Sequence, residues 1–89
     1  MTKRLFKVID EAGLHARPAS LLVQKASSFT EDIRIFYKDK TFTLKSIMVL
    51  MSLGIGQHAE FEIGVPGDNG EAILDALEEV LITHKIIDA

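Results

Sequence analysis

Hydrophobic and polar residues follow two repeating patterns along the chain, one with a period of two residues and one with a period near 3.6 residues. The two-residue alternation is typical of strands that bury one face. It marks segments 4–9, 32–37, 41–44 and 60–65. Apolar residues at three- and four-residue spacing, the stripe of an amphipathic helix, recur over segments 16–28 and 70–83. The pattern therefore predicts four strands and two long helices.

A shorter apolar cluster predicts a further helix between the third and fourth strands. Ser46 is an N-cap-type residue directly before this cluster, and Gly54 closes it. Its apolar members are Ile47, Met48, Leu50, Met51 and Leu53. The charged turn 38–40 joins two β-rich segments into a hairpin. We expect the last helix to fray after Thr83.

The elements follow one another in the order β-α-β-β-α-β-α, without an internal repeat or a linker. We therefore expect a single domain over residues 1–89. Hairpin-compatible connections favour an α+β fold, in which a mainly antiparallel sheet has its helices on one face.

Composition excludes several function classes. A hydrophobic fraction of 47% with 26% charged residues is ordinary for a soluble globular domain. The net charge of −3 argues against a general nucleic-acid binder, which would show a basic stripe. Without cysteine there is no disulfide or cysteine-built metal site, and we expect neither a metal nor another cofactor. Charged residues interrupt the N-terminal apolar segment, so we expect no membrane insertion and assign the chain to the cytoplasm.

The segment GLHARPAS, residues 13–20, contains the candidate chemistry. His15 lies at the predicted start of the first helix, and Pro18 falls in its first turn, where the N–H groups have no intrahelical partner. A helix N-terminus attracts anions, and Arg17 adds a guanidinium. An unprotonated ring nitrogen placed there could accept a phosphoryl group. An exposed histidine at a turn beside a solvated arginine fits the same residues equally well.

Two separated motifs make the chain similar to a known family. Segment 13–19, GLHARPA, resembles the active-site signature of HPr, the histidine-containing phosphocarrier family of the bacterial phosphoenolpyruvate-dependent sugar phosphotransferase system. Segments 44–48 and 51–54 are similar to that family's second signature, around a regulatory serine. The resemblance covers nearly the whole chain. It implies an open-faced β-sandwich, with a four-stranded antiparallel sheet covered on one face by three helices.

The resemblance also implies roles for individual residues. His15 would be phosphorylated by enzyme I and would pass the group to sugar-specific IIA domains, while Arg17 stabilises the phosphate and Pro18 fixes the helix start. Ser46 would be modified by an HPr kinase/phosphorylase, as in low-GC Gram-positive bacteria. A phosphoserine at a helix N-cap is physically reasonable because the helix dipole favours an anion there. Ser46 would also serve as a plain N-cap, and the two roles are compatible.

A partner-binding surface beside His15 is a further implication of the resemblance. Its members would be Leu14, Leu21, Ile47, Met48 and Met51. Burial tendencies alone would place Ile47, Met48 and Met51 in the core of a short helix. We expect a monomer, because a small carrier must expose one face repeatedly.

Two positions depart from the family pattern, and one relative suggests another function. Val49 and His58 stand where the family commonly has Gly. The alternative function is a Crh-like regulatory module that acts through phospho-Ser46 on a catabolite-control transcription factor. Crh proteins lack the histidine at the position of His15, so its presence favours a carrier. A nitrogen-related HPr paralogue is disfavoured by the intact segment 44–48.

Overall fold

The computed structural model describes residues 1–88, which form four strands and three helices. The strands are β1 (Thr2–Lys7), β2 (Arg34–Tyr37), β3 (Lys40–Thr43) and β4 (Glu60–Val65). The helices are α1 (Ala16–Ser27), α2 (Ile47–Ser52) and α3 (Gly70–Thr83). The predicted element order is therefore confirmed.

The strands form one antiparallel sheet in the order β1-β4-β2-β3. Register follows the alternation in the sequence, since Phe6 pairs with Phe61 and Ile35 pairs with Ile63. These four side chains are buried and point to the same face of the sheet. The alternate residues of the same strands point to the opposite face, where Glu62 pairs with the exposed Leu5.

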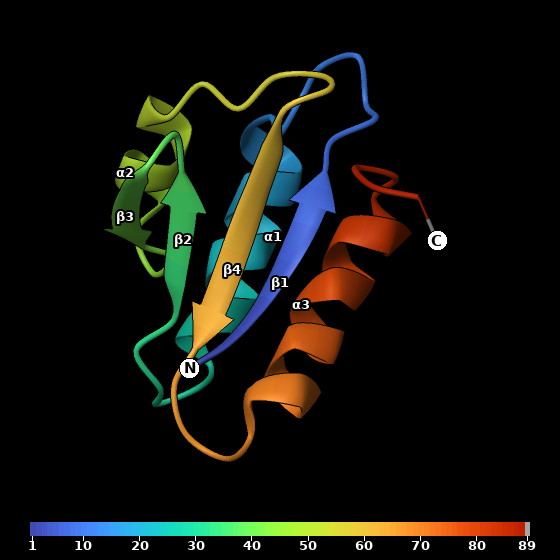
Figure 1. Ribbon diagram of the computed structural model, residues 1–89. Coiled ribbons are helices and arrows are strands. Elements are labelled where there is room, and N and C mark those ends of the chain that lie inside the picture. The colour runs from blue at the N-terminus through green and yellow to red at the C-terminus, as the bar shows by residue number, and fades with distance from the viewer. Residues whose placement is uncertain (89) are drawn as a thin grey trace.

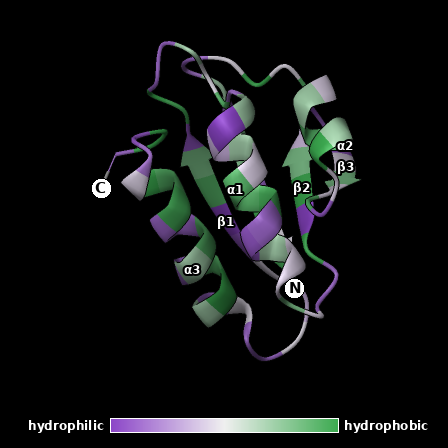
Figure 2. Cartoon of the chain, turned by 180° about the vertical axis from the view of Figure 1, so that it is seen from behind, coloured by the Kyte–Doolittle hydropathy of each residue, from purple (hydrophilic) through white to green (hydrophobic). Residues whose placement is uncertain are grey.

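The helices cover only the apolar face of the sheet, as Figure 1 shows. Hydrophobic residues recur along α1 and α3 in the view from behind, Figure 2. On α1 the buried positions are Pro18, Ala19, Leu22 and Ala26, and α1 packs against both α2 and α3. The predicted open-faced sandwich, with an antiparallel sheet and three helices, is confirmed.

The first three strands differ from their predicted bounds by one or two residues at each shifted end, and two of these differences have a clear cause in the backbone. β1 ends at Lys7 because Val8 pairs instead with the loop before β4, where its N–H donates to Ala59 O at 2.9 Å. The hairpin turn contains two residues, not three, because Lys38 and Asp39 both adopt positive φ of 50° and 64°. That backbone matches the tight turns favoured between twisted strands, so Lys40 already belongs to β3.

The C-terminal segment is ordered by packing, and the expectation of fraying after Thr83 is wrong. α3 ends at Thr83, but Ile86 and Ile87 are buried. The N–H of Ile86 donates to Leu81 O at 2.9 Å, and its carbonyl accepts the N–H of Ile9 at 2.7 Å. Ile86 and Ile87 therefore cover the edge of the sheet just after β1.

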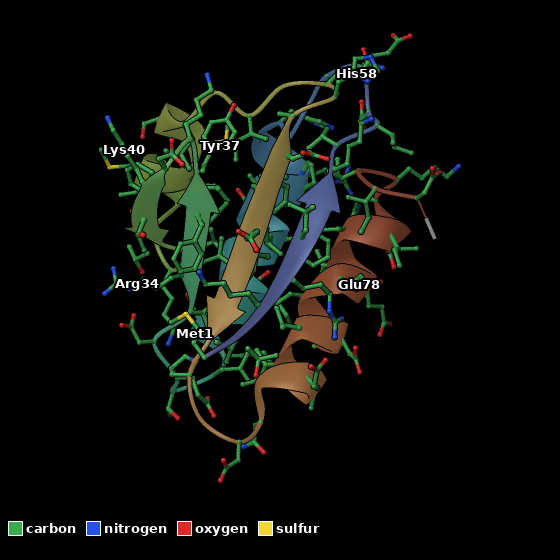
Figure 3. The ribbon with its side chains drawn as sticks, viewed as in Figure 1. Met1, Arg34, Tyr37, Lys40, His58 and Glu78 are labelled. Atoms are coloured by element: carbon green, nitrogen blue, oxygen red, sulfur yellow. The ribbon has the colours of Figure 1, made fainter. Side chains whose placement is uncertain are left out.

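Arg4 joins β1 to α3 through three carboxylates. It donates to Glu71 at 2.7 Å, to Asp75 at 2.9 Å and to Glu78 at 2.8 Å. Glu78, labelled in Figure 3, projects from α3 toward β1. Partial burial lowers the pKa of Arg4, but the hydrogen bonds to Asp75, Glu78 and Glu71 outweigh it. The pKa of Arg4 therefore lies above its ordinary value.

Among residues 1–88, no helix is both long enough and apolar enough to pass through a membrane.

Candidate functional site

The loop between β1 and α1 is bound along its length to the loop that precedes β4. The N–H of Leu14 donates to Ile55 O at 2.9 Å, and the N–H of His58 donates to Val8 O at 2.8 Å. Between them, the Gln57 amide donates to the Ile9 carbonyl at 3.1 Å. Figures 1 and 3 show these two loops side by side, with His58 at their outer end. The candidate site is thus built on paired loops held by backbone hydrogen bonds.

Gly13 makes the close contact between these loops possible. Its φ is +68°, a left-handed conformation that side chains with a Cβ disfavour. A Cβ at this position would lie 2.5 Å from Ile55 O and 2.8 Å from the Gly56 Cα. The N–H of Gly13 also closes a turn to the carbonyl of Asp10 at 2.9 Å. Only glycine fits this backbone, which sets where His15 begins the helix.

His15 is the N-cap residue of α1, with an extended backbone at φ −82° and ψ 177°. Its carbonyl accepts the N–H of Ala19 at 3.0 Å, but its side chain makes no capping hydrogen bond. The imidazole is 45% exposed, and its Nε2 lies 3.5 Å from Oδ2 of Asp10. The ring is thus accessible from solvent and faces one carboxylate through one nitrogen.

The first turn of α1 offers an uncompensated positive end next to His15. The N–H groups of Ala16 and Arg17 have no partner within the helix, and no acidic residue lies in this turn. Pro18, which is buried, lacks an N–H and so leaves no further donor to satisfy. Arg17 is exposed and forms no ion pair within residues 1–88. An anion on the imidazole would meet donors and positive charge together.

Ser46 is the N-cap of α2, as the sequence predicts. Its Oγ accepts the N–H of Val49 at 3.3 Å, and no acidic residue lies in the first turn of α2. Lys45, the preceding residue, donates through Nζ to Phe29 O at 2.6 Å and so ties this helix start to the end of α1. The hydroxyl is half-buried, and its oxygen stabilises the helix start.

Three apolar side chains of α2 are exposed. Met48 is 83% exposed, while Ile47 and Met51 are exposed to a smaller degree. Burial tendencies alone had placed all three in the core, and that interpretation is wrong because α2 buries Leu50 instead. Leu14 differs from the expectation in the other direction: it is only 6% exposed and packs in the core, because its backbone is bound to the loop before β4. Leu21 is half-buried.

A comparison of the sequence with protein families identifies one match. The model described as the PTS HPr component phosphorylation site matches residues 2–83. The chain belongs to the HPr family. A phosphocarrier role in the phosphotransferase system follows at the level of the family.

Solved structures give the same result. A histidine-containing phosphocarrier protein of Mycoplasma is 34% identical and superposes with a TM-score of 0.92, covering 99% of this chain and 100% of that one. HPr of Bacillus anthracis is 40% identical with a TM-score of 0.79, covering 89% and 94%. Crh, the catabolite repression HPr of Bacillus subtilis, is 32% identical with a TM-score of 0.68, covering 99% and 100%. The chain is thus similar to both HPr and Crh structures.

The sequence predicted that His15, Arg17 and Pro18 lie at one helix start, but the carboxylate of Asp10 was not among the predicted site residues. Its signal in the sequence is an aspartate three residues before a glycine, which is typical of a turn in which the side chain accepts a backbone N–H. The hydrogen bond from Ala12 N to Asp10 Oδ1 at 2.8 Å is that turn. Residues 1–88 hold no group of three or more His, Cys, Asp or Glu side chains placed to bind a metal ion.

Proposed function

We propose that this chain accepts a phosphoryl group on His15 from phosphorylated enzyme I and passes it to the IIA domains of sugar permeases. The single observation that supports this best is the imidazole of His15, 45% exposed at the start of α1. It makes no capping hydrogen bond, so one ring nitrogen stays available. Because the chain belongs to the HPr family, phosphoryl transfer is the reaction that this arrangement supports best.

The transfer uses the ring nitrogen that does not face Asp10. Because Nε2 lies against the Asp10 carboxylate, Nδ1 is the nucleophile. Its lone pair forms the bond to phosphorus while the bond between phosphorus and the donor breaks, and that electron pair leaves with the donor. Arg17 and the free N–H groups of the first turn offset the charge of the bound phosphoryl group. Pro18 fixes the backbone that presents the ring.

Incubation with phosphoenolpyruvate and a bacterial enzyme I tests this proposal. We expect one acid-labile phosphate per chain, absent from His15→Ala and present in His84→Ala, which removes a histidine outside the site. Arg17→Ala should be labelled more slowly, because a positive charge next to the phosphoryl group is lost. Equal labelling of His15→Ala and the parent would refute the assignment.

Ser46 is proposed as a regulatory phosphorylation site for an HPr kinase/phosphorylase. A phosphoserine adds about −1.5 to −2 charges at the start of α2, where the dipole favours an anion and no acidic residue repels it. The helix therefore stays folded, and the new charge acts on partners that dock beside it. Incubation with ATP and a cognate kinase should give an acid-stable phosphate that is absent from Ser46→Ala but present in Ser52→Ala. No label on the native chain would end this part of the proposal.

The exposed side chains Ile47, Met48 and Met51, here called the α2 patch, are proposed to bind these partners. Flexible thioether side chains suit a surface that receives several partners in turn. Met48→Asp should slow phosphoryl transfer from enzyme I by weakening docking. Leu5→Asp, which puts the same charge at an exposed apolar position on the open face of the sheet, should leave the rate unchanged. Equal effects of both substitutions would speak against the α2 patch.

A Crh-like regulator is the second candidate, because the chain is also similar to Crh. Such a protein would act through phospho-Ser46 on a catabolite-control transcription factor. His15 favours the carrier, and the labelling with enzyme I distinguishes the two functions. As a carrier the chain would work in the cytoplasm as a monomer, without binding nucleic acid directly.

A further inference from the structure

We infer that Asp10 is a positioning residue that holds the proton of the neutral His15 ring on Nε2 and so leaves Nδ1 free for the phosphoryl group. The inference rests on the proposed function and deepens it. Its basis is the 3.5 Å separation between His15 Nε2 and Asp10 Oδ2, with the Asp10 side chain 26% exposed and the imidazole 45% exposed.

The two oxygens of the Asp10 carboxylate have separate partners. Oδ1 accepts the backbone N–H of Ala12 at 2.8 Å, which fixes the rotation of the carboxylate. The carbonyl of the same residue accepts the N–H of Gly13 at 2.9 Å. With Oδ1 engaged in the turn, Oδ2 is the oxygen that faces the imidazole.

The backbone that bears Asp10 is anchored on both sides. Ile9, directly before it, donates its N–H to Ile86 O at 2.7 Å and accepts the Gln57 amide at 3.1 Å. Leu14, directly before His15, donates to Ile55 O. The separation of Asp10 and His15 is therefore set by the paired loops, and not only by two flexible side chains.

A carboxylate opposite Nε2 favours the tautomer with hydrogen on that nitrogen. An orienting carboxylate fixes a histidine tautomer in this way in catalytic triads. The 3.5 Å separation is longer than a formed hydrogen bond, and such contacts shorten when reacting groups are bound. When Nδ1 forms its bond to phosphorus, the ring becomes positively charged while Nε2 keeps its proton, and the Asp10 carboxylate faces that charge. When the phosphorus–Nδ1 bond breaks, its electron pair returns to Nδ1, and no proton has to move.

The substitution Asp10→Asn separates this role from a structural one. The bond from Ala12 N requires an oxygen at the Oδ1 position, so the turn is kept and the amide NH₂ takes the place of Oδ2. An NH₂ donates a hydrogen bond, so it favours an unprotonated Nε2 and places the ring hydrogen on Nδ1. Since the tautomers exchange rapidly, the transfer rate should fall in proportion to the remaining population of the Nε2–H form.

The experiment measures the tautomer and the rate on the same variants of the full chain. ¹⁵N NMR of the imidazole, recorded on the neutral ring, reports the hydrogen position. Labelling by phosphoramidate, a small phosphoryl donor that needs no docking surface, and by phosphorylated enzyme I reports the rate, with His15→Ala as background. For Asp10→Asn we expect a shift of the hydrogen toward Nδ1 and about tenfold slower labelling of Nδ1 by both donors, less than in a buried triad because this pair is partly exposed.

Two variants serve as controls. Glu11→Gln removes the same charge from the neighbouring exposed residue and should change neither readout. Asp10→Ser keeps an oxygen for the N–H of Ala12 but puts no group against the ring. Its labelling rate and its Nε2–H population should therefore lie between those of the parent and of Asp10→Asn. If Asp10→Asn shows no thermal unfolding transition and is therefore not folded, the tautomer and the labelling rate of Asp10→Ser alone test the role of Asp10.

Each outcome bears on one hypothesis. An unchanged tautomer, or labelling of Nδ1 in Asp10→Asn at the parent rate, overturns the role of Asp10, as does an equal loss in Glu11→Gln. Parent protein that takes no label on His15 from either donor overturns the proposed function instead, and the NMR result on the tautomer is obtained independently of labelling.

Discussion

The N–H of Leu14 donates to the carbonyl oxygen of Ile55 at 2.9 Å, which fixes the residue directly before His15 to the loop preceding β4. His15 thus begins α1 at a position determined by residues about forty positions later in the chain. The two backbones can approach this closely because Gly13 has no Cβ, which would lie 2.5 Å from Ile55 O. The placement of the imidazole therefore depends on packing between two loops as well as on the helix it caps.

Replacing Gly13 by alanine should disturb both the fold and the site. The left-handed backbone costs roughly 1–2 kcal/mol for a residue with a Cβ, and the new Cβ would lie 2.5 Å from Ile55 O. We expect Gly13→Ala to lower the free energy of unfolding by about 2 kcal/mol or more. The loops must also separate, so phosphoryl transfer to His15 should slow. Urea denaturation and the labelling rate measure the two effects.

Gly54 provides the matched control for Gly13. Its φ is +61°, but no atom lies within 4 Å of the Cβ that alanine would add. Gly54→Ala should therefore lose only the conformational part, about 1 kcal/mol, and leave the labelling rate unchanged. Equal losses of stability in the two variants would mean that the contact with Ile55 has no energetic weight.

Position 58 should accept glycine with a gain in stability. His58 has φ +72°, and its N–H is held by Val8 O, so the strained backbone is imposed by the paired loops. His58→Gly should raise the free energy of unfolding by about 0.5–1 kcal/mol. His58→Ala keeps a Cβ and should give no gain. Thermal and urea unfolding of the parent and the two variants measures these differences. A gain in stability in the alanine variant would show that the imidazole itself is unfavourable.

The repeating patterns were sufficient to predict the elements because each is a local property. Alternation marked β4 at its observed bounds, Glu60–Val65, and the three- to four-residue stripe marked α1 and α3 within one or two residues. The N-cap role of Ser46 was also local, since the hydroxyl bonds an N–H three residues later. These features need no knowledge of the rest of the fold.

Features that depend on distant contacts could not be predicted in the same way. The pair Ile86 and Ile87 is too short to show a period, and its order comes from Ile9 on the edge of the sheet. Asp10 faces His15 only because the turn at Gly13 reverses the chain between them. Periodicity also gave no sign that Met48 is exposed, because an apolar residue on a six-residue helix fits either face.

Removing the Ser46 hydroxyl should weaken α2 without unfolding the chain. Ser46→Ala loses the bond from Val49 N, and we expect the free energy of unfolding to fall by about 1 kcal/mol. Ser46→Asp keeps a cap oxygen and adds a negative charge where the helix dipole favours one, so it should stay within about 0.5 kcal/mol of the parent. Urea denaturation measures both. A loss in Ser46→Asp as large as in Ser46→Ala would contradict the capping role.

Arg4 should couple energetically to Glu78 more strongly than to Asp75. Both carboxylates accept from the same guanidinium nitrogen, but the Glu78 side chain is 34% exposed and that of Asp75 is 73% exposed, so water screens the second pair more. Double-mutant cycles that combine Arg4→Met with Glu78→Gln or with Asp75→Asn should give coupling energies of about 1 kcal/mol and about 0.3 kcal/mol, respectively.

Because the pKa of Arg4 is raised, the contribution of its charge is present at all pH values below the ordinary arginine pKa and is lost only as pH rises beyond it. The first coupling energy should therefore not change between neutral and mildly alkaline pH. A ranking with Asp75 above Glu78 would show that burial does not determine the strength of these pairs.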